Sequence, residues 1–224
     1  MHSSRLRMKN IHVNNYILNF HPIPKGQIQY RVDWDKKAHR NQFIKRGVTT
    51  IDIDILEDVW MSETLITQEI WSEIMGKNPS KFKGANKPIE HISYNEIAAF
   101  INKLNSVTTQ KFRLIKESEF IYACILNYDN NLPNRLNEFV WFAENSNGQT
   151  QAVLSKPSGK LKFSDLLGNV YHFVENDVTQ VDSNKCLYKG ACWATQALWV
   201  DKDYVMKIDK DDKHNTIGFR LVLI

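Results

Sequence analysis

The chain has few of the residues that mark extracellular, fibrous or membrane proteins. Of its 224 residues only three are cysteine, nine are glycine and six are proline. Three cysteines are an odd number and have no zinc-ligand spacing, which argues against a disulfide framework and fits a reducing compartment. No uncharged apolar run approaches the roughly 20 residues that span a membrane, and residues 1–20 lack the continuous apolar segment of a signal peptide. We therefore expect a cytoplasmic protein with no membrane segment.

The composition is that of an ordinary globular protein. Hydrophobic residues make up 42% of the chain and charged residues 24%, which excludes a disordered or fibrous chain. The length suits one large domain or two small ones. Because no internal repeat, low-complexity tract or linker divides the chain, we expect residues 1–224 to form one domain.

Positive charge is concentrated near the start. Residues 1–47 hold ten lysines and arginines against two acids, whereas residues 48–224 hold 19 against 23. The early basic residues alternate with apolar ones and no nucleic-acid motif accompanies them, so we interpret them as one solvated face and do not expect nucleic acid as a partner. This basic N-terminal face is a second candidate surface for protein contact, around Arg31, Lys36, Lys37, Arg40, Lys45 and Arg46.

Short elements with a long irregular middle are predicted. Alternating apolar residues indicate strands at 28–32 and 48–60. Helical spacing predicts helices at 68–75, 94–105 and 116–125, the first ended by Gly76 and the second started by a capping box between Ser93 and Glu96. Residues 112–114 are extended, 127–181 form long loops, and two buried strands at 187–193 and 217–224 flank a charged connection at 201–214. Gly168–Asn169 is expected to form a tight buried turn that tolerates substitution less well than Gly159.

Six segments, in order along the chain, resemble one family. They are ETLITQEIWSEIMGKNPSKFKG, KPIEHISYNEIAAFINKLN, FRLIKESEFIYAC, DLLGNVYHF, YKGACW and IGFRLV. Together they are similar to the motifs of the formylglycine-generating enzyme or sulfatase-modifying-factor family, from about residue 20 to the end. The resemblance implies an α+β fold, an elaborated C-type-lectin-like domain with low regular secondary structure.

The resemblance also implies chemistry that this chain does not support. Enzymes of the family oxidise a substrate cysteine to formylglycine with oxygen and copper held by two thiolates, and soft thiolates suit Cu(I). Residue by residue, those two cysteine positions are Thr195 and Val200, so we expect no copper and no formylglycine-generating activity. His172 replaces a glutamate that the resemblance associates with calcium, and imidazole is a poor ligand for that hard cation. We therefore expect no cofactor.

The expected function is binding. We interpret the chain as a pseudoenzyme that binds a protein or peptide, or a small ligand, within a multi-component bacterial system. The alternative is an oxidoreductase with a changed metal site that includes His172 and Cys192. His91 and His214 are interpreted as surface or structural histidines, since no metal-ligand spacing joins them. The candidate binding residues in the family's groove are Cys192, Trp193, Gln196, Trp199 and His172.

Overall fold

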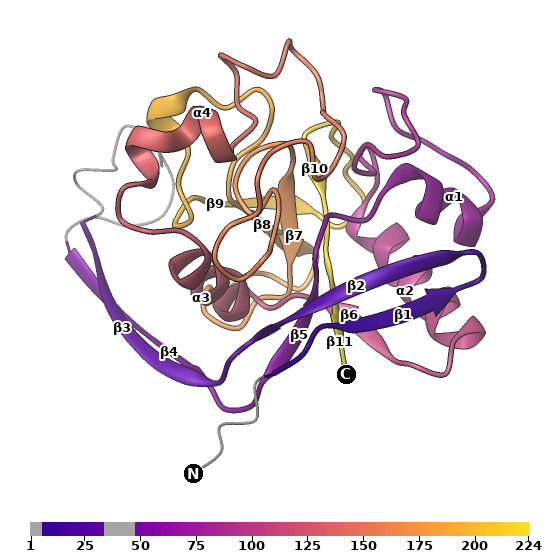
Figure 1. Ribbon diagram of the computed structural model, residues 1–224, viewed down its shortest axis with the longest axis horizontal. Helices are drawn as coiled ribbons and strands as arrows, with labels where there is room; N and C mark the ends of the chain where they lie inside the picture. The colour runs from indigo at the N-terminus through magenta and orange to yellow at the C-terminus, as the bar shows by residue number, and fades with distance from the viewer. Residues whose placement is uncertain (1–5, 34–47) are drawn as a thin grey trace.

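The computed structural model describes residues 6–33 and 48–224, and these form three sheets with short helices packed around them (Figure 1). The largest sheet has the strand order β1-β2-β5-β11-β6. It joins both ends of the chain, because the C-terminal strand pairs with β5 on one side and β6 on the other. Its strands are β1 (Lys9–Val13), β2 (Tyr16–Ile23), β5 (Val59–Ser62), β6 (Phe112–Leu114) and β11 (Leu221–Leu223).

A two-stranded ribbon, β3 (Gly26–Asp33) with β4 (Val48–Ile55), curves away from this sheet (Figure 1). Ile28 pairs with Ile53 and Tyr30 with Ile51, so alternate residues turn to the core while Gln29 and Asp52 bond on the outer face. The expected single strand at 48–60 is wrong. Residues 56–58 separate β4 from β5, and the two strands belong to different sheets.

The third sheet has the order β10-β7-β8-β9, with β10 parallel to β7 and the other pairs antiparallel. Three predictions need correction here. The strand expected at 187–193 ends at Lys189, because Gly190 has φ 90° and the chain then leaves the sheet. The strand expected at 217–224 is two strands in different sheets, divided at Phe219 and Arg220, and the expected charged connection contains β9. The strands are β7 (Tyr171–Val174), β8 (Lys185–Lys189), β9 (Val205–Asp209) and β10 (Ile217–Gly218).

The three predicted helices are confirmed. They are α1 (Gln68–Met75), α2 (Tyr94–Val107) and α3 (Glu117–Asn127). Gly76 ends α1 in the left-handed region at φ 75°, and the Ser93–Glu96 capping box starts α2. Thr67 precedes α1, but its hydroxyl makes no capping bond. The irregular middle also contains η2 (Leu132–Arg135) and α4 (Leu136–Phe139), and η3 (Ala197–Trp199) follows β8.

Two hydrophobic clusters form the core. One lies between the five-stranded sheet, α1 and α2, with Trp71 stacked on Phe100 at 5.1 Å. The other surrounds α3 and the irregular middle. Across the second cluster a buried ion pair joins Lys189 Nζ on β8 to Glu117 Oε1 on α3 at 3.1 Å, so the helix and sheet are fixed to each other by charge as well as by packing.

None of the described helices has the length and apolar character needed to cross a membrane. Of the basic N-terminal face, Arg31 is exposed on β3, whereas the predicted contributions of Lys36, Lys37, Arg40, Lys45 and Arg46 lie outside the described residues.

Candidate functional site

A groove of about 610 Å³ opens between the end of α3, the η2–α4 turn and the segment after η3. The walls are mostly apolar. Asp129 and Lys202 bring both signs of charge to the same cavity. Such a cavity, apolar with a few polar groups, is the usual form of a ligand site. Its lining residues are Cys124, Ile125, Tyr128, Asp129, Asn130, Leu132, Pro133, Leu136, Leu167, Ala197, Leu198, Val200, Asp201 and Lys202.

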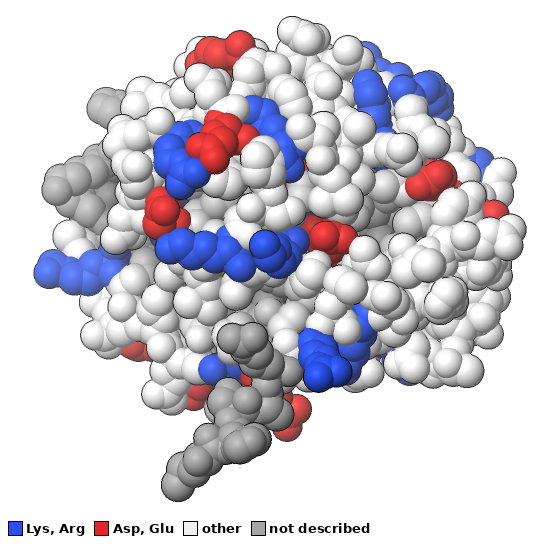
Figure 2. All heavy atoms as spheres, in the orientation of Figure 1, with Lys and Arg blue, Asp and Glu red and all other residues white. Residues whose placement is uncertain are grey.

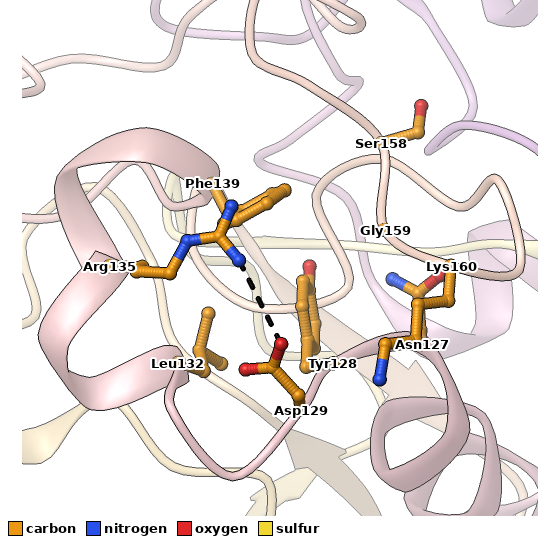
Figure 3. Close-up of a pocket in the computed structure, with 9 residues that line it drawn as sticks. All are labelled: Asn127, Tyr128, Asp129, Leu132, Arg135, Phe139, Ser158, Gly159 and Lys160. Carbon is orange, nitrogen blue, oxygen red and sulfur yellow. Dashed lines mark ion pairs between the residues drawn. The ribbon is translucent and has the colours of Figure 1, made fainter.

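A smaller cavity of about 240 Å³ adjoins this groove and shares Tyr128, Asp129 and Leu132 with it (Figure 3). Arg135 lies at its edge, 3.8 Å from Asp129 and 2.6 Å from Glu138, with its guanidinium 4.6 Å from the centre of the Phe139 ring. Asp129 and Glu138 pair with Arg135, and Lys160 also lines this smaller cavity, so the positive and negative charges around it are balanced.

The segment that forms one wall is held by backbone contacts. The Glu144 carboxylate accepts hydrogen bonds from Ala197 N at 3.2 Å, and Ala143 N donates to the Thr195 carbonyl. These bonds fix the start of η3 and leave its side chains outward. Leu198 is 71% exposed and Trp199 39% exposed. Gln196, directly before η3, is also exposed.

Cys192 belongs to a buried turn behind this wall. Thr195 Oγ1 accepts a hydrogen bond from Cys192 N at 2.9 Å and lies 2.9 Å from the Tyr171 hydroxyl. The Cys192 sulfur accepts a hydrogen bond from Ala194 N at 3.4 Å. Burial raises the pKa of this thiol, so it remains protonated at neutral pH. Cys192 therefore supports the wall and offers no reactive surface.

Trp193 links two loops by packing and hydrogen bonds. Its indole Nε1 donates to Asn215 O at 3.0 Å, its backbone N donates to Asn169 O, and its ring meets Phe82 edge-on at 5.2 Å. It fastens the loop after α1 to the loop before β10. Of the two tryptophans predicted to bind, Trp199 is the one with an outward face.

His172 lies in the core on β7, away from solvent. Its Nε2 accepts a hydrogen bond from Arg220 Nε at 3.0 Å, and its ring packs on Phe120. Burial, and then the neighbouring Arg220 charge, hold the pKa of His172 well below its usual range, so the imidazole is neutral. It does not line the groove, and the prediction that it contacts a ligand there is not supported by its position.

The two family cysteine positions have different surroundings. Thr195 is buried in the turn with Cys192, whereas Val200 is half-buried and lines the groove. Within residues 6–33 and 48–224, no three His, Cys, Asp or Glu side chains are grouped so as to hold a metal ion. The alternative metal site with His172 and Cys192 thus has no ligand set in this part of the chain.

Most of the groove was not predicted from the sequence. Only Val200 of its 14 lining residues was named there as a site position, and none of the five candidate binding residues lines the groove: Cys192, Trp193, Gln196, Trp199 and His172. Tyr128, Leu132 and Leu136 come from the stretch interpreted as long loops. The spacing of Leu132 and Leu136 was the available signal, because residues four apart share a helical face. The asparagines around these two leucines are typical of loops, and they obscured this helical spacing.

One family model covers nearly the whole chain. The family described as Sulfatase-modifying factor enzyme 1-like domain matches residues 3–223. The chaperone protein LppX of Paenibacillus barcinonensis is 20% identical over 83% of this chain and 85% of its own length.

Among solved structures, Treponema denticola variable protein 1 has a TM-score of 0.80 at 19% identity, covering 96% of this chain and 98% of its own. PvdO from Pseudomonas aeruginosa has a TM-score of 0.72 at 15% identity, covering 92% and 94%. CarF has a TM-score of 0.61 at 15% identity, covering 92% of this chain and 97% of its own. At these identities the structures show the fold alone, and they confirm the predicted fold class. The chain belongs to the sulfatase-modifying factor enzyme 1-like, or formylglycine-generating enzyme-like, family.

Proposed function

We propose that this protein is a binding module that takes an apolar side chain of a protein or peptide partner into the groove. The observation that carries the proposal is the position of residues 197–202. All of them except Trp199 line the 610 Å³ cavity, and the neighbouring Leu198 and Trp199 are both exposed. Tryptophan is one of the residues enriched among the anchors of protein recognition.

The lining favours a peptide over a highly charged ligand. Asp129, Asp201 and Lys202 place both signs of charge among apolar walls, which suits a segment with an apolar anchor flanked by polar groups. Figure 2 shows lysines, arginines and acids intermixed around α4, with no field of a single sign there. A relative that is named a chaperone fits a role in binding protein segments. The further proposal, membership of a multi-component bacterial system, rests on the resemblance.

Peptide selection tests this function. A displayed random peptide library is selected on the wild-type chain, with counter-selection on Leu198→Glu. We expect enriched peptides with a large apolar residue, whose affinity, measured by fluorescence polarisation, falls about tenfold or more in Leu198→Glu and in Trp199→Ala, as for an interface anchor.

Leu56→Glu is the matched control, since Leu56 is 78% exposed on another part of the surface, and it should leave affinity unchanged. Melting temperatures should be similar in all variants. Peptides that bind Leu198→Glu as tightly as wild type would contradict the groove as the site. A large fall in melting temperature for Trp199→Ala with binding retained would show that Trp199 is a packing residue.

A further inference from the structure

A third cavity, of about 440 Å³, shares no residue with the groove or with the smaller cavity beside it. It lies between the loop that follows α1 and the loop that precedes β10. Four of its six lining residues are basic or imidazole side chains and none is acidic. The lining residues are Pro79, Lys81, His91, Lys213, His214 and Asn215.

The two histidines come from distant parts of the sequence and are held together by the backbone. His91 N donates to the His214 carbonyl at 3.0 Å. His91 has φ 59°, the left-handed region that non-glycine residues seldom adopt. The loop that carries His214 is anchored by its next residue, because Asn215 O accepts a hydrogen bond from the Trp193 indole N–H. The backbones that carry the two imidazoles are therefore held next to each other at the cavity wall.

The nearby lysines exceed the acids available to neutralise them. Residues 77–87 contain four lysines and no acid, and Figure 2 shows lysines gathered over the loop after α1, at the upper right. Glu96 is paired with Lys213 at 2.7 Å, and Asp211 accepts a bond from Asn95. Glu90 is buried beneath the loop, and burial raises its pKa. The charge of Lys81 interacts with the Glu90 carboxylate beneath it, and Lys81, His91 and His214 are exposed side chains that line the cavity.

We propose that this cavity binds an oxyanion, the phosphate or sulfate group of an ester. The ammonium and imidazole N–H groups that line this cavity are donors for the acceptor oxygens of such a group, and charge-assisted hydrogen bonds of this kind are the stronger class. The cavity is open, so the rest of the ester extends into solvent. This site is independent of the groove and would add a second, charged contact to whatever the groove binds.

Inorganic phosphate is the probe. Carbon–proton spectra of the histidine rings are recorded during a phosphate titration, with chloride exchanged to keep ionic strength constant. We expect saturable shifts of the His91 and His214 signals and none for the buried His172. The same series with sulfate compares the two oxyanions. Vesicles of phosphatidylcholine with and without phosphatidic acid distinguish a lipid headgroup from a free ester, since only the headgroup source predicts co-sedimentation.

Two variants complete the test. Lys81→Gln should weaken phosphate binding about tenfold, as expected for losing a hydrogen bond from a charged donor, while the His91 ring still reports. Lys103→Gln, an exposed lysine on α2, should leave binding unchanged. Shifts that rise linearly without saturation, or an affinity that Lys81→Gln and Lys103→Gln change equally, would overturn the proposal.

Discussion

Arg220 is the residue at which the buried polar contacts meet. It is fully buried and donates to His172 Nε2, to the carbonyls of Ser62 and Glu63 at 3.0 and 2.8 Å, and to the Ser164 carbonyl. His172 occupies the place of a glutamate in the motif that this chain resembles, so a neutral acceptor meets the guanidinium in place of a charge. Burial lowers the pKa of Arg220 to about 10, and at neutral pH it remains a cation.

Asp165 and His172 give opposite dependences of stability on pH. Burial raises the pKa of Asp165 from 3.8 to about 6, so its contribution is present below the lower value and is lost as pH rises through 6. The pKa of His172 is lowered, so its contribution is present above its usual value and is lost as pH falls. Between about pH 4 and 6 the two effects oppose each other.

The variant Asp165→Asn separates the effect of Asp165 on stability from that of His172. Asparagine tolerates the left-handed backbone at this position, φ 54°, and only the histidine effect remains. The free energy of unfolding should then fall more steeply on acidification from pH 7 to 4 than in wild type, by roughly 3 kcal/mol from the pKa difference. Urea unfolding at several pH values measures this. The exposed Asp182→Asn is the control, and equal slopes for wild type and Asp165→Asn would contradict the assignment.

At the scale of elements, the turn at Gly168–Asn169 connects the irregular middle to β7. Both residues have positive φ, 83° and 61°, and Asn169 is fully buried. Its amide accepts Gln151 N and donates to Gln151 O, each at 3.0 Å. The predicted tight buried turn is confirmed. Crowding does not distinguish Gly168 from Gly159, because a side chain at Gly159 would also be crowded, with Asn127 O only 2.5 Å away. The predicted contrast in stability therefore depends on the positive φ of Gly168.

Gly148 is the better comparison. Like Gly168 it has positive φ, 67°, but a Cβ there would have no atom within 4 Å, whereas at Gly168 it would lie 2.5 Å from Val140 Cγ1 and closer to the Trp141 carbonyl. Gly148→Ala should cost about 1 to 2 kcal/mol of backbone strain. Gly168→Ala should cost about 1 to 3 kcal/mol more, from overpacking. Thermal and urea unfolding measure both, and similar losses would refute the crowding argument.

At the scale of the whole molecule, we predict no oxidation of cysteine to formylglycine. One family cysteine position is Thr195, buried with Cys192 and Tyr171, and the other is Val200 on the groove wall. Incubation of a C-x-P-x-R peptide with copper, oxygen and the chain should leave the thiol intact by mass spectrometry. The double variant Thr195→Cys with Val200→Cys should gain Cu(I) binding at most, because the adjoining Cys192 also departs from the family motif. Aldehyde product from the unmodified chain would contradict this.

The sequence by itself determined the family, the three helices and the location of one groove wall. These depend on local signals: the Ser93–Glu96 box, the glycine after α1, and ordered motifs from about residue 20 to the end. Contacts between distant residues decided the rest. No local pattern shows that Ile217 and Leu221 join different sheets. Between them, the Arg220 side chain bonds to the carbonyls of Ser62 and Ser164, which are distant in the sequence. Nor does spacing along the chain bring His91 to His214, or Leu132 to Val200. The groove and the cavity at His91 are each formed by segments that meet only when the core around them has packed. A single sequence contains no information on the distance between such segments.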